Sequence, residues 1–132
     1  MKPTLKDGVT ATRKVDIDTA RTIDFMGDAL RVYATPELVR DIEHTCRDLL
    51  LEHLDEGEDS VGTRVEIDHT GATLLGMTVS ISPTIKSVEG RLVTFEVIAE
   101  DNLEPVAKCT HVRFVVETSK LEQRLQAKAA KI

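Results

Sequence analysis

Aromatic residues are scarce in this sequence: tryptophan is absent, and aromatic residues together make up 3% of the chain. A protein that holds single-stranded nucleic acid by stacking needs aromatic side chains, and one that binds phosphodiester backbones or anionic membranes needs a basic surface. Here 23 acidic residues outnumber 17 basic ones, which gives a net charge of −6. We therefore expect neither nucleic acid nor a membrane as a partner.

Long apolar runs are missing as well. No segment approaches the roughly 20 apolar residues that cross a bilayer, and the N-terminal sequence MKPTLKDGVT lacks the apolar stretch of a signal peptide. Cysteine occurs only at Cys46 and Cys109, which lack the spacing of metal ligands. We expect a reduced, cytoplasmic protein with two free thiols and no bound metal.

Several short motifs of common enzyme classes are also absent. The chain has no glycine-rich phosphate loop, no GxSxG elbow and no dinucleotide fingerprint. Its 132 residues are 41% apolar and 30% charged, without a low-complexity tract or a solenoid repeat. This length and composition predict a single globular domain over residues 1–132.

One segment has a strong helical pattern. In TPELVRDIEHTCRDLLLEHLDEGED, Thr35 is a good N-cap and Pro36 a good first helical residue, while Gly57 is a stop signal. Apolar residues recur at helical spacing and form one stripe: Leu38, Ile42, Cys46, Leu49 and Leu50. The pattern predicts one amphipathic helix of about 19 residues that follows the cap at Thr35.

The rest of the chain has the two-residue period of β-strands. We expect a first strand in GVTATRKVDID (8–18), an irregular segment over 18–34, a polar helix after Ser119, and strands near 61–72, 77–88, 91–100 and 105–117. The short links between these last four strands predict an antiparallel meander. The predicted inward residues are Val65, Ile67, Val79, Ile81, Ile85, Val93, Phe95, Val97, Val112, Phe114 and Val116.

A sheet of this kind can wrap its apolar face around the single long helix. We therefore predict an α+β hotdog fold, an antiparallel sheet of about five strands around one long central helix. An isolated subunit would leave a sheet edge unpaired and part of the helix exposed. For this reason we expect a homodimer, with a tetramer as a further possibility.

Two histidines differ in their expected positions. His69 has the parity of Val65 and Ile67, so it should point inward. There it can be a core histidine bonded to a backbone carbonyl, or a general acid or base. His111 has the parity opposite to Val112, so we expect it on the solvent or dimer face.

Two helical residues complete the set of candidates. Glu43 lies at the edge of the apolar stripe, where partial desolvation makes a carboxylate a better base or nucleophile. Taken alone, Glu43 is more simply explained as a surface carboxylate that pairs with Arg47 at i+4. Thr35 lies about two helical turns earlier, near the same side, and its role as N-cap is a sufficient explanation for it.

The order of these residues resembles a known family. The resemblance rests on YAT at 33–35, Glu43 eight residues after Thr35, SVGTRVEIDHTGATLLGMTV at 60–79, SVEGR at 87–91 and CTHVRFVV at 109–116. It extends from Val9 to about Lys128, and the family is that of the fluoroacetyl-CoA thioesterases, which have the hotdog fold. The resemblance implies an acyl-CoA thioesterase with Thr35, Glu43 and His69 as catalytic residues, and with CoA as part of the substrate rather than a cofactor.

The resemblance also implies substrate contacts. The backbone N–H of Gly62 would hold the thioester carbonyl, and Arg91, within SVEGR, would contact the CoA phosphates. The other strand cations available for the phosphates are Arg64, Lys86, Lys108 and Arg113.

The chain departs from the family at one place. The fluoroacetyl-specific pattern has phenylalanines in the lid before the helix, but here the segment reads FMGDALRVYAT, with Ala29 and Leu30 in its middle. The hydrolytic residues therefore carry over better than the fluoroacetyl substrate does. The main alternative is a non-catalytic hotdog module that binds an acyl-CoA or another small ligand. A hotdog hydratase is a second alternative, but its Asp and His pattern on a short helix is not found here.

Overall fold

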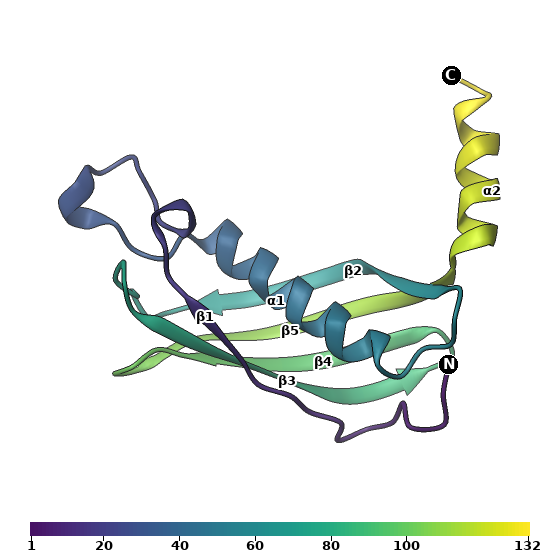
Figure 1. Ribbon diagram of the computed structural model, residues 1–132, viewed down its shortest axis with the longest axis horizontal. Coiled ribbons are helices and arrows are strands. Elements are labelled where there is room, and N and C mark those ends of the chain that lie inside the picture. Colours follow the sequence, from purple (N-terminus) through teal and green to yellow (C-terminus); the bar gives the residue numbers. More distant parts are fainter.

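The computed structural model describes residues 1–132. Its elements are β1 (Arg13–Asp16), two short 3-10 helices (Thr19–Arg21 and Asp28–Leu30), α1 (Thr35–Leu51), β2 (Glu58–His69), β3 (Thr78–Glu89), β4 (Leu92–Glu100), β5 (Pro105–Glu117) and α2 (Thr118–Ala129). The strands form one antiparallel sheet in the order β1-β3-β4-β5-β2. The helix α1 lies along one face of this sheet, and α2 stands away from it (Figure 1). This is the predicted hotdog architecture.

The helix α1 forms as predicted, with one difference at its start. It has 17 residues, with Pro36 in its first turn, and its N-cap is Ala34, which makes no side-chain capping bond. The prediction that Thr35 is the N-cap is therefore wrong, and the hydroxyl of Thr35 is free for another contact. The predicted stripe is confirmed, because Leu38, Ile42, Cys46, Leu49 and Leu50 are all buried.

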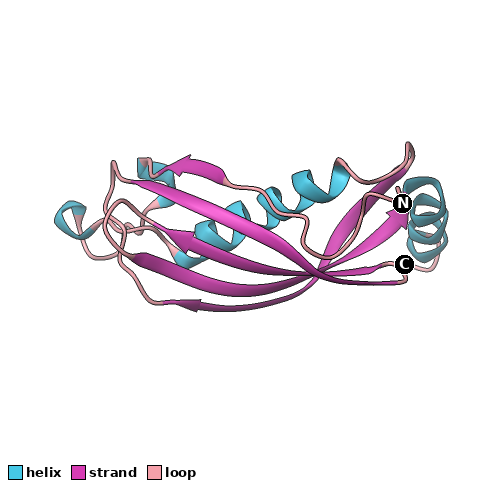
Figure 2. Cartoon of the chain, turned by 90° about the horizontal axis from the view of Figure 1, so that it is seen from below, coloured by secondary structure: helices cyan, strands magenta, loops and turns pink.

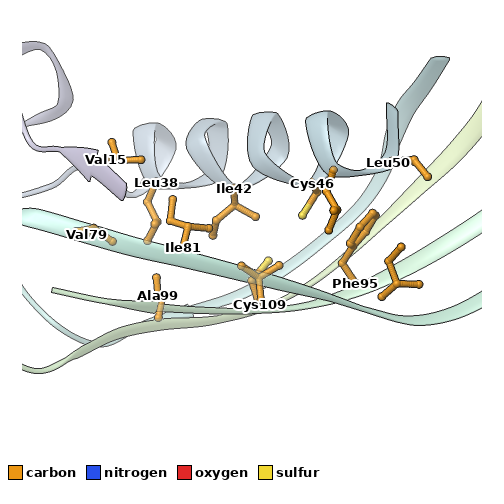
Figure 3. Close-up of a cluster of buried hydrophobic side chains, with 14 of the residues drawn as sticks. Val15, Leu38, Ile42, Cys46, Leu50, Val79, Ile81, Phe95, Ala99 and Cys109 are labelled. Carbon is orange, nitrogen blue, oxygen red and sulfur yellow. The ribbon is translucent and has the colours of Figure 1, made fainter. Parts of the chain in front are cut away.

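The stripe of α1 packs on the inner face of the sheet. Figure 3 shows it above side chains of β3, β4 and β5, among them Ile81, Phe95 and Cys109. Figure 2 shows the strands extending along the length of the helix. The predicted inward residues of β3 and β4 are confirmed, since each is at most 2% exposed. Burial of each such large apolar side chain contributes about 1.5–3 kcal/mol, and this contact fixes how the helix lies on the sheet.

The connectivity of the sheet differs from the predicted meander. The strand β2 pairs with β5, from Glu58 opposite Glu117 to His69 opposite Ala107, and it forms one edge of the sheet. The link over residues 70–77 crosses the end of the sheet to reach β3, and on its way the Gly71 N–H donates to the carbonyl of Val106. Three strand spacings of about 4.8 Å separate β2 from β3, a distance that eight residues reach easily. A short link between two consecutive strands therefore does not show that they are neighbours in the sheet.

The parity predicted for β5 is also wrong. Val112 and Phe114 are half-buried on the outer face, whereas His111 is fully buried and Arg113 is 4% exposed on the inner face. His111 lies opposite Phe95, so it shares the face of the core rather than the solvent or dimer face. Apolar residues occur at both odd and even positions of this strand, so their alternation alone does not show which face points inward.

The C-terminal helix α2 begins at Thr118, close to the predicted start at Ser119, and none of its residues is buried. It projects from the end of β5 (Figure 1). Neither α1 nor α2 has the length and apolar character needed to cross a membrane.

We expect the contact between α1 and the sheet to dominate stability. Ile42 is 0% exposed, so Ile42→Ala should lower the free energy of unfolding by about 2–5 kcal/mol through lost burial and the cavity that remains. Leu103→Ala is the control, because Leu103 is 85% exposed and its loss should change stability by less than about 0.5 kcal/mol. Urea unfolding at one fixed protein concentration measures both; equal midpoints for the two variants would contradict the packing described.

Candidate active site

The first candidate pair joins the start of α1 to the end of β2. The Thr35 Oγ1 lies 2.8 Å from the His69 Nδ1. His69 is on the inner face together with Val65 and Ile67, as their parity predicted, and the ring of Tyr33 packs edge-on against it with centroids 6.4 Å apart. The free hydroxyl of Thr35 thus has a histidine as its partner. We call these two residues the Thr35–His69 pair.

The surroundings of His69 favour its neutral form. Burial lowers the pKa of His69 from its ordinary value of 6.5, and a backbone hydrogen bond with Gly71 opposes this shift in part. A neutral imidazole can accept a proton near pH 7, and the adjacent hydroxyl is the nearest group that can exchange one with it. The pair is therefore suited to general acid–base chemistry.

The second candidate group surrounds a buried arginine. The Arg113 Nη1 lies 3.3 Å from the Glu43 Oε2 and 3.1 Å from the His111 Nε2. On its other side, the Arg113 Nε donates to the Ser60 Oγ at 2.8 Å, and the Nη2 donates to the Ser60 carbonyl at 2.9 Å. The Glu43 side chain remains 39% exposed, while that of Arg113 is 5% exposed. A partly solvated carboxylate is thus held by a cation inside the protein.

Gly62 completes this second group. It lies opposite Arg113 in the β2–β5 ladder, just before a shift of register between Gly62 and Arg64. A Cβ atom at position 62 would lie 2.7 Å from the Glu43 Oε2, which is closer than real Cβ contacts. Glycine is therefore needed here for the carboxylate to approach the strand. We call Glu43, Ser60, Gly62, His111 and Arg113 the Arg113 cluster.

Three members of this cluster, Ser60, His111 and Arg113, were not predicted for it from the sequence. His111 was expected on the outer face, and Arg113 was counted among the cations for the CoA phosphates. Arg113 does line the hollow beside Glu43, but it is 4% exposed and its guanidinium is engaged by Ser60, His111 and Glu43. The signal that could have revealed His111 and Arg113 is their common parity with Cys109 and Val115, which are buried on the inner face.

The structure keeps the two groups apart within one protomer. Glu43 makes no hydrogen bond to Thr35 or His69. Eight residues of helix separate Thr35 from Glu43, about 12 Å along the axis. Seven residues of strand separate Gly62 from His69, roughly 20 Å when extended. The structure thus pairs Thr35 with His69 and Glu43 with Gly62, but it does not bring these pairs into contact.

Arg91 is engaged at the far end of β5 from His69. Its guanidinium donates to the Val115 carbonyl at 3.3 Å and to the Glu117 Oε1 at 3.2 Å, beside the start of α2. A hollow of about 270 Å³ does lie next to Glu43, and its lining includes Arg40, His44 and Arg47. The guanidinium side chains that line this hollow are those of Arg40, Arg47 and Arg113, and not that of Arg91. No group of three or more metal-ligating side chains lies close together.

Comparisons with known proteins give a consistent result. The model of the fluoroacetyl-CoA-specific thioesterase family, FlK, matches residues 17–119. The fluoroacetyl-CoA thioesterase of Streptantibioticus cattleyicolor is 34% identical over 97 residues, which cover 74% of this chain and 70% of that protein.

Solved structures agree with the sequence relatives. The crystal structure of a point variant of the fluoroacetyl-CoA-specific thioesterase FlK superposes with a TM-score of 0.87 at 28% identity, and covers 96% of this chain and 99% of that one. The same variant in complex with fluoroacetate and CoA gives a TM-score of 0.82 at 29% identity, over 89% of this chain and 99% of that one.

The buried histidines predict a pH dependence of stability. Burial lowers the pKa of both His69 and His111 below 6.5, so between their folded-state pKa values and 6.5 the unfolded chain binds more protons. The free energy of unfolding should therefore fall as the pH drops from about 7.5 through 6.5, by at most about 1.4 kcal/mol per pH unit for each histidine. Urea unfolding across this range measures the slope. It should be shallower in His69→Gln, and a flat profile in the wild type would contradict the burial of both rings.

Proposed function

The chain belongs to the family of fluoroacetyl-CoA-specific thioesterases, and from this membership we propose that it hydrolyses the CoA thioester of a small acyl group to the free acid and CoA. The observation that carries the proposal is the contact between the Thr35 Oγ1 and the His69 Nδ1, at 2.8 Å. A threonine at the start of a helix would ordinarily cap it, but this hydroxyl is directed to a histidine that burial keeps neutral. Such a hydroxyl–imidazole pair is a typical proton-transfer unit of hydrolases.

The Thr35–His69 pair would handle the proton of the reaction. The attacking group and the thioester lie near the N-terminus of α1, where the helix dipole favours developing negative charge. His69 takes a proton from the attacking water, with Thr35 orienting the ring. It then returns this proton to the CoA sulfur as the carbon–sulfur bond breaks. The imidazole is neutral at the start and at the end of the cycle, so its protons balance.

The Arg113 cluster would supply the carboxylate and the carbonyl contact. Glu43 either orients the water from which His69 takes the proton, or attacks the thioester carbon itself. In the second route the CoA thiolate leaves and an acyl–Glu43 anhydride forms. A water deprotonated by His69 then cleaves this anhydride to the free acid and the Glu43 carboxylate, and His69 passes the proton to the thiolate. The Gly62 N–H would donate to the thioester oxygen. Two features support this role: the close approach of Glu43 to Gly62, and the shift of register beside Gly62, since such irregularities locally disrupt the hydrogen bonds of the ladder.

We propose further that a homodimer unites the two groups. The strand β2 is a 12-residue edge strand on which Val61 and Val65 are 42% and 38% exposed. An unpaired edge of this length is a ready surface for pairing with a second copy. An antiparallel pairing of two β2 edges about a two-fold axis near Val65 would place Gly62 beside His69 of the partner subunit. Glu43 of one protomer would then act with the partner's Thr35 and His69.

The direct test is release of free CoA thiol from a panel of short, branched, aromatic and halogenated acyl-CoAs. Wild type should hydrolyse at least one class, and Glu43→Ala and His69→Ala should each lose more than about a hundredfold in kcat, as expected for an essential acid–base group. Glu89→Ala is the control, because Glu89 is exposed at the end of β3, beside the turn to β4, and it should retain full activity.

The panel also separates the competing function. A wild-type protein that binds CoA esters but releases no thiol would be a non-catalytic binding module, and the thioesterase proposal would be wrong. Retention of activity in Glu43→Ala or His69→Ala would instead remove that residue from the mechanism.

A further inference from the structure

His111 is a fully buried histidine that the proposed reaction leaves without a role. Its ring stacks on Phe95 with centroids 6.3 Å apart, and its two nitrogens have different partners. The Nδ1 lies 2.8 Å from the backbone oxygen of Arg64, and the Nε2 lies 3.1 Å from the Arg113 Nη1. Neither nitrogen reaches solvent or substrate directly, so any effect of His111 on the reaction must pass through a neighbour.

The partners of His111 fix its protonation state. The Arg64 carbonyl can only accept a hydrogen bond, so Nδ1 carries the proton. The guanidinium of Arg113 can only donate, so Nε2 must offer its lone pair. His111 is therefore the neutral tautomer with hydrogen on Nδ1, and it acts as an acceptor towards Arg113. An imidazolium at this position would place two cations 3.1 Å apart inside the protein.

The hydrogen bond that the His111 Nε2 accepts from Arg113 helps to fix the orientation of the guanidinium. The Ser60 hydroxyl and carbonyl hold the Nε and Nη2 edge, while Nη1 is shared between His111 and Glu43. A guanidinium fixed on both sides can hold the Glu43 carboxylate in one place against Gly62. Without the His111 acceptor, Nη1 keeps only the exposed carboxylate, and the pair gains freedom to move.

We propose that His111 is a positioning residue, which holds the Arg113 guanidinium in the orientation that places the Glu43 carboxylate over Gly62. This inference rests on the proposed function only in that Glu43 is taken to act in hydrolysis. The charged and titratable groups around His111 are Arg113 on its own strand and Glu43 on α1, while the Arg64 backbone contacts it from β2. Burial lowers the pKa of His111, the bond to the Arg64 carbonyl opposes this shift in part, and the nearby Arg113 charge adds to it, so the net direction agrees with a neutral ring.

Two substitutions separate positioning from a purely structural role. His111→Gln can place an amide oxygen near the Nε2 position and so accept from Arg113, but it loses the donor to the Arg64 carbonyl. His111→Asn can keep a donor for that carbonyl, but it offers no acceptor to Arg113. Positioning predicts that Asn lowers kcat about 10- to 100-fold with little change in KM, whereas Gln remains within a few-fold of wild type. A structural role in anchoring β2 predicts the reverse order, and that result would overturn the proposal.

A double-mutant cycle tests whether the effect passes through Arg113. In an Arg113→Met background, which keeps the apolar stem but removes the donors, His111→Asn should lower kcat by less than about twofold further. A full additional loss of 10-fold or more would show that His111 acts independently of Arg113 and would contradict the proposal. Unfolding midpoints of all variants are recorded in parallel, so that a variant that fails to fold is identified.

A measurement without substrate keeps the inference separate from the proposed function. In ¹⁵N NMR of the folded wild type, the His111 ring should show hydrogen on Nδ1 near neutral pH, and its Nε2 resonance should shift in Arg113→Met but not in Glu89→Ala. Hydrogen on Nε2, or a charged ring, would overturn the inference whether or not the protein hydrolyses acyl-CoA. Absence of hydrolysis with the expected NMR pattern would refute only the proposed function.

Discussion

The buried guanidinium of Arg113 is the group on which the rest of the site depends. A buried charge is costly unless its hydrogen bonds are satisfied, and Arg113 meets this condition through three elements: Ser60 on β2, His111 on β5 and Glu43 on α1. These contacts tie the helix to the edge of the sheet at one point. They also explain why β2 has glycine at position 62, because a side chain there would displace the carboxylate.

In the mechanism that we propose, one protomer alone would not form a complete site. The Arg113 cluster and the Thr35–His69 pair both lie where α1 meets β2, but at positions separated by two turns of the helix. Both groups border the unpaired edge of the sheet, beside the exposed Val65. Pairing of the β2 edges of two protomers would bring the carboxylate of one protomer close to the imidazole of the other. Because of the two-fold axis, the same interface would form two equivalent sites. In this proposal, the surface that holds the dimer together is also the surface that forms the active site.

Local pattern was sufficient for most of the fold. The apolar stripe of α1 and the alternation in β3 and β4 each had one consistent solution, and the structure has it. The predicted strand order was wrong because the eight-residue link between β2 and β3 can either turn back to a neighbouring strand or cross the end of the sheet. The inward residues predicted for β5 were wrong because both faces of this strand carry apolar residues. The inward positions of His111 and Arg113 were therefore not predicted. Hydrophobicity cannot reveal polar groups that are buried because they satisfy one another, and these groups define the Arg113 cluster.

The most direct test of the shared site is subunit mixing. Glu43→Ala and His69→Ala, each inactive alone, are combined in equal amounts under conditions that allow subunits to exchange. If each site takes Glu43 from one protomer and His69 from the partner subunit, a mixed dimer has one intact site, and random mixing should restore about a quarter of wild-type activity. If the mixture exchanges subunits but stays inactive, each site lies within a single chain and the account of a shared edge is wrong.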